Sequence, residues 1–436
     1  MLCCRVRRPE PTLEVAVPDT PETHTTTSAS PVADLQRRLA EDAFANAYAF
    51  TRADEAEALG VHPYFKTIQE QRGGTVVVDG REMIISGSND YLGLTQDPRL
   101  KTAARDALGE FGTSCTGSRF LTGTLSLHDA LETRLAEFFR KESALTFSAG
   151  YLGSLSVVSA LAGRRDVLYF DRENHACLYD GARLSFAELR KYQHGDVDDL
   201  ARLLDRDQDK PGGRIIVTDG VFSMSGAIAP LPDIIEVAQR YGARVIVDDA
   251  HASGVLGATG RGTAEHFGVE DEVDLILGTF SKSFASVGGF IAGPAKVISY
   301  VKHHARPFIF TAALPAMQMA AALRALEIMD AEPELRSRLW RNVHHLRNGL
   351  TELGYNTMGS QTPILPVVVG EDEVAFRFWR ALWDAGIFTT PAVPPGVPPG
   401  MSIIRTSVNA DHTPEQLDRL LDAFGTVGRA LELIET

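Results

Sequence analysis

Short and almost continuous apolar runs alternate with helical stretches between residues 144 and 293, and this pattern limits the fold most strongly. Six runs are rich in β-branched and aromatic residues and are predicted strands: residues 144–148, 166–170, 214–219, 243–249, 273–280 and 288–293. Runs without polar alternation are typical of parallel strands that are buried on both faces. Helical patterns such as residues 126–140 lie between them. The alternation predicts a doubly wound α/β domain whose mostly parallel central sheet is flanked by helices.

The pattern divides the chain into four segments. Residues 1–33 are rich in Thr, Pro and Ser and are predicted to be a disordered leader. Residues 34–84 form an N-terminal helix and hairpin segment, residues 85–315 the large α/β domain, and residues 316–436 a smaller C-terminal α+β domain. The helical stretch over residues 33–59 has an imperfect apolar stripe. We expect it to pack on its own chain or on a second subunit rather than on another partner or a membrane.

Composition removes several classes of function. The net charge of −14 argues against a broad nucleic-acid surface, although a small basic pocket for one phosphorylated ligand stays open. Four cysteines without a CxxC pair argue against a disulfide scaffold and a structural zinc site, so we expect no metal and a reducing, cytoplasmic location. No apolar run reaches the roughly 18 residues of a spanning helix, which leaves peripheral contact as the one form of membrane association to consider.

Common catalytic motifs are absent from the sequence. It has no GxxxxGK[ST] phosphate loop, no GxGxxG, no HExxH and no GxSxG. ATP hydrolysis, Rossmann-type NAD binding, zincin chemistry and α/β-hydrolase chemistry are therefore disfavoured.

Three polar sites follow predicted strands, where open parallel sheets bind ligands. Asp248 ends one strand and His251 follows it; Lys282 follows another between hydroxyl residues; His175 follows a third. Taken singly, each has an ordinary structural explanation: a turn cap for Asp248, an exposed loop lysine for Lys282 and a satisfied histidine for His175. Taken together they fit pyridoxal phosphate, which needs a Schiff-base lysine, an acid at its ring nitrogen, a wall for its ring and a phosphate cradle. The turn at Gly150–Tyr151 with Thr279 supplies the cradle.

Longer motifs resemble one enzyme family. They are SNDYLGL (88–94), GTSCTGSRFLTGT (112–124), FSAGY (147–151), DRENHACLYDGARLS (171–185), TDGVFSM (218–224), VDDAH (247–251), GATGRGTAEHF (257–267) and GTFSKS (278–283). From about Gly60 to Phe424 the chain resembles the α-oxoamine synthases, a branch of the fold-type I pyridoxal-phosphate transferases. The pieces ALGVHPYFKTI, GTSCTGSRFLTGTL and GTFSKSFASVGGFIAG look most like the bacterial serine palmitoyltransferases of that family.

The resemblance implies a role for each matching position. Lys282 would form the internal aldimine, Asp248 would face the pyridine nitrogen, and His251 the phenolic oxygen. His175 would stack on the ring and contact the substrate carboxylate, and Ser223 would lie near the phenolic oxygen. The phosphate would be held by Gly150, Tyr151, Thr279 and Ser281 and, from the second subunit, by Thr311. Asn89 and Arg405 would contact the substrate carboxylate. Three positions depart from the family pattern: Gly195 within His-Gly-Asp, Ser225 after FSM, and Ala316 after Pro315.

The implied reaction is a decarboxylative Claisen condensation of an amino acid with an acyl thioester. For the palmitoyltransferases the substrates are L-serine and palmitoyl-CoA and the product is 3-oxosphinganine, in the first step of sphingolipid biosynthesis. The alternatives are the 8-amino-7-oxononanoate synthase and 2-amino-3-ketobutyrate CoA ligase types, a glycine and succinyl-CoA enzyme, or a silent homologue, which the presence of Lys282 disfavours. The family implies a homodimer with shared active sites. The sequence leaves open the amino acid, the acyl length and the choice between CoA and acyl-carrier-protein.

Overall fold

The structure is a computed structural model that describes residues 42–435. The chain divides into two units, residues 1–60 and 61–436. In the first unit the described residues form α2 (Ala45–Tyr48) and α3 (Arg52–Ala58). In the described part of the stretch whose composition favours helix, residues 33–59, the helix is broken between Tyr48 and Arg52. Thr51 is the N-cap of α3, and its hydroxyl donates to the Glu55 carboxylate rather than capping a backbone N–H. The predicted leader lies outside the described residues.

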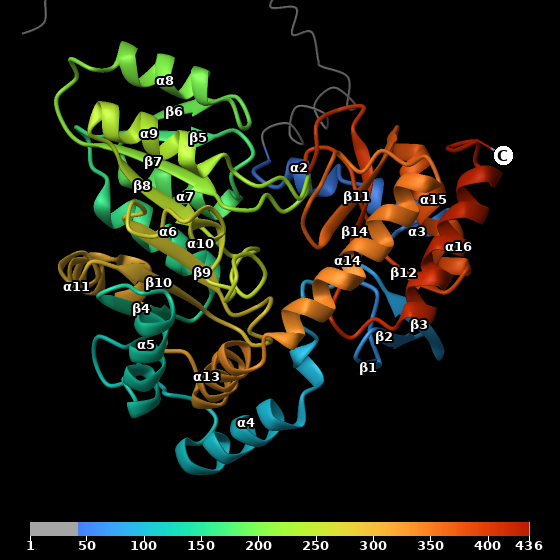
Figure 1. The fold of residues 1–436 in the computed structure, drawn as a ribbon, viewed down its shortest axis with the longest axis horizontal. Helices are drawn as coiled ribbons and strands as arrows, with labels where there is room; N and C mark the ends of the chain where they lie inside the picture. The colour runs from blue at the N-terminus through green and yellow to red at the C-terminus, as the bar shows by residue number, and fades with distance from the viewer. Residues whose placement is uncertain (1–41, 436) are drawn as a thin grey trace, which may run out of the picture. The chain divides into compact units, whose positions relative to one another are not determined.

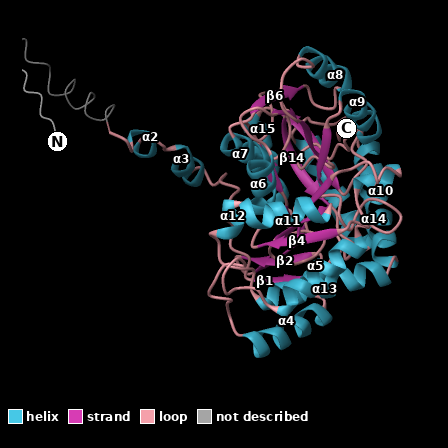
Figure 2. Cartoon of the chain, turned by 90° about the vertical axis from the view of Figure 1, so that its left-hand side faces the viewer, coloured by secondary structure: helices cyan, strands magenta, loops and turns pink. Residues whose placement is uncertain are grey.

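The second unit is built on a seven-stranded sheet (Figures 1 and 2), which confirms the predicted fold class. Its strands, in spatial order, are β4 (Ser143–Phe147), β10 (Gly289–Gly293), β9 (Leu275–Thr279), β8 (Arg244–Asp248), β7 (Arg214–Asp219), β5 (Val167–Asp171) and β6 (Glu188–Tyr192). The pairs from β9 to β6 are parallel, and β10 is antiparallel to both of its neighbours.

Helices cover both faces of this sheet because its strands are apolar on both. Leu145, Leu168 and Ile246 pack into one apolar cluster, and the residue before each of them packs into the other. The first face carries α6 (Gly150–Leu161), α7 (Ala176–Ser185), α11 (Ala295–His304) and α12 (Arg306–Ile309). The second face carries α5 (Ser126–Phe138), α8 (Val197–Arg206), α9 (Leu231–Tyr241) and α13 (Ala316–Ala331).

Two smaller sheets complete the second unit. Strands β1 (Glu70–Arg72), β2 (Thr75–Val78), β3 (Arg81–Ile85) and β12 (Ile387–Phe388) form one sheet, and β11 (Ile364–Gly370), β14 (Ser402–Ser407) and β13 (Thr390–Ala392) form the other. The predicted hairpin is present as β2 and β3, and β3 pairs with β12 in parallel. The hairpin therefore shares a sheet with the C-terminal part. The domain boundaries at residues 84 and 315 stay predictions.

The second unit contains further helices. They are η1 (Leu94–Gln96), α4 (Pro98–Phe111), α10 (Thr263–Phe267), α14 (Glu334–Glu352), α15 (Asp372–Asp384) and α16 (Pro414–Ala430). At the start of α16 the Gln416 amide donates to the Thr413 hydroxyl, and the Thr413 amide donates to the Gln416 side chain, closing a capping box. No helix within residues 42–435 is long and apolar enough to cross a membrane.

Candidate active site

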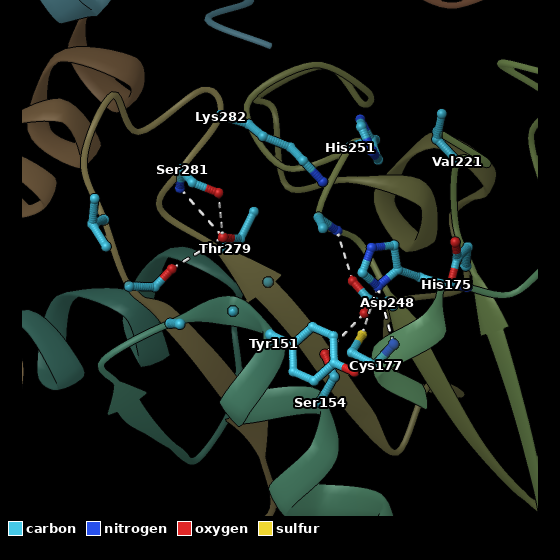
Figure 3. A pocket seen from close by; sticks show the side chains of 17 residues that line it. Tyr151, Ser154, His175, Cys177, Val221, Asp248, His251, Thr279, Ser281 and Lys282 are labelled. Atoms are coloured by element: carbon cyan, nitrogen blue, oxygen red, sulfur yellow. Dashed lines mark hydrogen bonds between the residues drawn. The ribbon is translucent and has the colours of Figure 1, made fainter. Parts of the chain in front are cut away.

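A cavity of about 300 Å³ lies where β7, β8 and β9 end and α6 begins (Figure 3). The carboxyl ends of parallel strands meet at this edge, so side chains that are distant in the sequence converge there. Its lining includes eight of the twelve residues predicted for the site: Gly150, Tyr151, His175, Asp248, His251, Thr279, Ser281 and Lys282. Cys177, Asp219 and Ser154 also line it.

Lys282 lies in the bend that follows β9, and its side chain points into the cavity (Figure 3). Burial lowers the pKa of its amine from 10.5 to about 8, and the carboxylates of Asp248 and Asp219 oppose that shift. A substantial fraction of this amine is therefore neutral near pH 8. A neutral lysine amine can act as a nucleophile toward an aldehyde or as a general base.

Asp248 ends β8 and is 6% exposed. Its Oδ2 accepts a hydrogen bond from the Ser154 hydroxyl at 3.0 Å, and its Oδ1 accepts one from the backbone amide of Ala250 at 3.1 Å. These donors hold the carboxyl group in a fixed orientation at the edge of the cavity. A buried carboxylate held in this way can stabilise a protonated ring nitrogen.

Asp219 was missed from the sequence. It ends β7 directly beside Asp248 in the sheet register, and it is 4% exposed. Burial, with the nearby Asp248 charge, raises the pKa of Asp219 well above its usual range. The signal in the sequence was the same as for Asp248, an acid where an apolar strand ends.

His175 is the N-cap of α7, and its Nδ1 accepts the backbone N–H of Cys177. The Tyr151 ring meets it edge-on, with 6.2 Å between ring centroids and 77° between planes. Burial lowers the pKa of the imidazole, so the ring is neutral near pH 7. A neutral, fixed ring at the cavity wall suits stacking on a planar ligand.

Gly150, Thr279 and Ser281 form a compact cradle at the start of α6. The Thr279 and Ser281 hydroxyls are 2.9 Å apart, and the Ser281 amide donates to Thr279 Oγ1 at 3.3 Å. A Cβ on Gly150 would lie 2.6 Å from Thr279 Oγ1, so this approach needs glycine. Amides at a helix start together with hydroxyls bind phosphate well. The Tyr151 hydroxyl donates to Asp180, which fixes the side of the cradle.

A hydrogen-bonded chain extends from the cavity to the C-terminal part of the unit. His251 Nδ1 lies 2.7 Å from the Tyr91 hydroxyl, which donates to Asn89 Oδ1 at 3.3 Å. Arg405 donates to the same Asn89 oxygen at 3.0 Å and to the Ser223 carbonyl at 2.7 Å. Asn89 and Arg405 are thus joined to the cavity through Tyr91, a residue that sequence reasoning also missed.

Four predicted residues do not line this cavity: Asn89 and Arg405, which the hydrogen-bonded chain joins to it, and Ser223 and Thr311. Thr311 lines a separate crevice with Arg119 and Pro307. Its contribution to a second subunit stays a prediction. Ser223 lines a second cavity of about 770 Å³, and its predicted place near the phenolic oxygen also stays a prediction.

The second cavity lies between the segment that leads to His175 and the proline-rich loop after β13. Its apolar lining residues are Phe222, Met224, Met358, Pro394, Pro395, Val397, Pro398, Pro399, Met401 and Ile403. Arg172, Glu173, Asn174, Gln193, His194, Ser223 and Ser225 supply polar groups. Methionines adapt readily to a flexible apolar ligand.

The first cavity fits pyridoxal phosphate by the chemistry of its side chains. It combines a lysine of lowered pKa, a fixed buried carboxylate, a neutral histidine wall and a cradle that a Cβ would fill. No group of side chains able to hold a metal ion is present among residues 42–435.

Comparisons with known proteins agree with this reading. A family model described as aminotransferase class I and II matches residues 81–424. The chain is 44% identical over 384 residues to a serine palmitoyltransferase of Sphingobacterium spiritivorum, covering 88% of this chain and 96% of that protein. It is also 44% identical over 375 residues to an 8-amino-7-oxononanoate synthase of Symbiobacterium thermophilum, covering 86% and 96%. A solved serine palmitoyltransferase from S. paucimobilis with a bound PLP–myriocin aldimine superposes with a TM-score of 0.85 at 34% identity, covering 93% of this chain and all of that one.

Proposed function

The chain belongs to the aminotransferase class I and II family and, within it, to the α-oxoamine synthases, and we propose that it condenses L-serine with a long-chain acyl thioester. It is an acyltransferase-type enzyme whose cofactor is pyridoxal phosphate. In the proposed reaction palmitoyl-CoA is the thioester, carbon dioxide and CoA are released, and the product is 3-oxosphinganine. This is the first step of sphingolipid biosynthesis.

Each proposed role follows from the surroundings of the residue. When bound, pyridoxal phosphate supplies an electron-accepting ring. Lys282 holds the cofactor and, once released, moves the proton at the amino acid Cα, for which a pKa of about 8 is well suited. Asp248 keeps the ring nitrogen protonated, and His175 stacks on the ring. Gly150, Tyr151, Thr279 and Ser281 hold the phosphate.

The amino acid carboxylate is assigned to Arg405 and Asn89, with His175 as a third contact. Arg405 is 8% exposed, and its guanidinium is fixed by hydrogen bonds to the Ser223 carbonyl and Asn89, so it presents a prearranged charge. His251 is assigned to the phenolic oxygen of the cofactor. The hydrogen bond to Tyr91 holds its ring in place.

The second cavity is the observation that carries the choice of a long acyl chain. Its prolines are apolar and its methionines are apolar and adaptable. Ser223 lines it, as does Asn174, the residue before His175. Each buried methylene contributes about 0.8 kcal/mol, so an apolar cavity of this size favours long chains. Sequence identity does not separate the candidates, because relatives of both kinds are 44% identical.

A turnover assay tests the proposal directly. Serine, alanine and glycine are each supplied with acyl-CoAs from two to eighteen carbons, and the expected kcat/KM is highest for serine with palmitoyl-CoA. The variant Met224→Trp, which fills part of the second cavity, should reduce the preference for palmitoyl over hexanoyl chains. Preference for alanine with a pimeloyl thioester would instead favour the 8-amino-7-oxononanoate synthase type, and glycine with acetyl-CoA the 2-amino-3-ketobutyrate CoA ligase type.

We also propose a homodimer with shared active sites and a cytoplasmic location. The free thiols of Cys115 and Cys177 are consistent with a reducing compartment. Thr311 lies outside the cavity of its own chain, as expected of a residue that serves a second subunit.

A further inference from the structure

We propose that Cys177 is a positioning residue that fixes the tautomer of His175, so that Nε2 of the ring carries the hydrogen and donates it to the carboxylate of the amino acid. The proposal rests on the proposed function in one respect, that the ligand is an amino acid. It concerns a residue to which neither the sequence motifs nor the proposed reaction assign a role.

The geometry at Nδ1 carries the inference. The backbone N–H of Cys177 donates to His175 Nδ1 at 3.3 Å, because His175 caps the first turn of α7. A ring nitrogen that accepts this hydrogen bond cannot carry a hydrogen itself. The Cys177 Sγ lies 2.9 Å from the same nitrogen, so the thiol is the donor in that contact. Two donors from one residue therefore converge on Nδ1.

The charges around the pair support neutral forms of both groups. Burial lowers the pKa of His175, with Asp248 opposing the shift and Lys282 reinforcing it. Burial also raises the pKa of the Cys177 thiol, and the Asp248 charge raises it further. Asp219 faces the pair from β7 and accepts the backbone N–H of His175 at 3.3 Å. The neutral thiol keeps its hydrogen, and the neutral imidazole has one acceptor and one donor nitrogen.

The donor nitrogen must then be Nε2. Within the described residues no protein group forms a hydrogen bond with Nε2, and the ring lies at the cavity wall with Tyr151 edge-on to it. An N–H in this position can bind a carboxylate oxygen. Protonation of Nδ1 would require the thiol and the backbone N–H to lose their hydrogen bonds, so the contact also opposes formation of imidazolium.

The test compares Cys177→Ala with Cys177→Ser in the holoenzyme. Alanine keeps the backbone donor and removes the side-chain donor, whereas serine keeps a hydroxyl donor. The matched control is Ser185→Ala, on the same helix, which removes a buried hydroxyl that donates to the Ala182 carbonyl at 2.7 Å. The affinity for serine, alanine and glycine is measured without acyl thioester as a function of pH.

Cys177→Ala should weaken amino acid binding about three- to tenfold, the usual effect of one lost hydrogen bond, and should raise the pH at which His175 becomes protonated at Nδ1. Cys177→Ser should bind within about twofold of the parent protein. In holoenzyme with ¹⁵N-labelled histidine, the signals lost in His175→Asn should show a hydrogen on Nε2, with that preference weakened in Cys177→Ala.

An Nδ1–H signal for His175 in the parent protein would overturn the proposal. So would Cys177→Ser binding as weakly as Cys177→Ala, or protonation of His175 at the same pH in Cys177→Ala as in the parent protein. The test compares three amino acids without a thioester. If the assignment of serine and palmitoyl-CoA is wrong, the effect of Cys177 can still be measured with the amino acid that binds.

Discussion

The surroundings of Lys282 favour the neutral form of its amine. In the protein without cofactor, burial of the charged amine therefore lowers the free energy of unfolding. Its pKa is about 8 in the folded chain and 10.5 when exposed. Below pH 8 the amine is charged in both states, and burial then opposes folding. The cost disappears as the pH rises from 8 to 10.5, because the unfolded chain alone still binds the proton.

Lys282→Met should therefore stabilise the apoprotein, most strongly near pH 6 and hardly at all above pH 10.5. The difference of 2.5 pKa units corresponds to about 3 kcal/mol as an upper figure. Urea unfolding of both apoproteins at pH 6 and pH 10 measures it. A stabilisation of equal size at the two pH values would show that packing, and not the charge, is responsible. The variant should have no turnover.

Asp248→Asn should separate cofactor binding from catalysis. The amide preserves the shape: its oxygen can accept from the Ala250 N–H, and its NH2 group can donate to the Ser154 hydroxyl, which then turns to accept. It has no charge to hold the ring nitrogen protonated. We expect cofactor binding to persist while kcat falls by a factor of 100 or more, since a loss of about 3 kcal/mol already gives that change. The exposed Asp271→Asn serves as the control. A rate within a few-fold of the parent enzyme would remove Asp248 from its assigned position.

At the scale of elements, the packing of the start of α6 against the end of β9 requires a glycine at position 150. In Gly150→Ala the new Cβ would lie 2.6 Å from Thr279 Oγ1 and 2.8 Å from its Cβ, so α6 and the end of β9 must separate. Affinity for pyridoxal phosphate should fall by about tenfold or more, because cradle hydrogen bonds to the phosphate are lost. Fluorescence titration of the apoprotein measures this affinity.

Gly109→Ala is the matched control for this helix change. Gly109 lies within α4, and a Cβ there would meet nothing within 4 Å. Alanine should raise the free energy of unfolding by up to about 1 kcal/mol and leave cofactor affinity unchanged. Equal affinity losses in the two variants would mean that helix stability, and not the cradle geometry, sets cofactor binding.

The elements with the strongest apolar pattern were predicted well, and those with polar faces were not. All six predicted runs contain strands of the large sheet, since strands buried on both faces are apolar throughout. Strand β6 was missed because Glu188, Arg190 and Lys191 lie on an edge strand, where charged residues are tolerated. The break before Thr51 was missed because helix-forming residues lie on both sides of it.

The parts of the site that depend on contacts between distant segments could not be predicted from the sequence. Eight predicted residues line one cavity because each follows a strand or begins a helix at the same sheet edge. The pairing of Tyr91 with His251 joins segments 160 residues apart, and nothing in either motif specifies it. The second cavity likewise depends on where the proline-rich loop packs. Cys177 could not be assigned a role from the sequence, because its contact with His175 needs the turn that starts α7.

At the scale of the whole molecule, the surroundings of Thr311 suit a second copy of the chain. Phe310, Leu121 and Phe120 are 76%, 77% and 49% exposed. A bridge between Ser118 and Ala312 joins the two segments that bear them. Large apolar side chains gathered on one surface are typical of protein interfaces. The enzyme should therefore be a dimer by sedimentation, and Phe310→Asp combined with Leu121→Asp should shift it toward the monomer.

A dimer with shared sites has a sharper consequence than size alone. Lys282→Ala and Thr311→Val should each have low activity as pure homodimers, the first because the amine is gone and the second because the phosphate loses a donor from the neighbouring chain. Within a mixed dimer, one site inherits both changes and the other inherits neither. Random exchange of equal amounts should therefore restore about a quarter of the sites.

Subunit exchange is verified with two affinity tags. The control is a mixture of Lys282→Ala with Asp248→Asn. Both of these residues serve the cavity of their own chain, so every site in a mixed dimer keeps one change. Recovery in the first mixture and not in the second is the expected result, and equal outcomes despite verified exchange would show that Thr311 does not serve the neighbouring site.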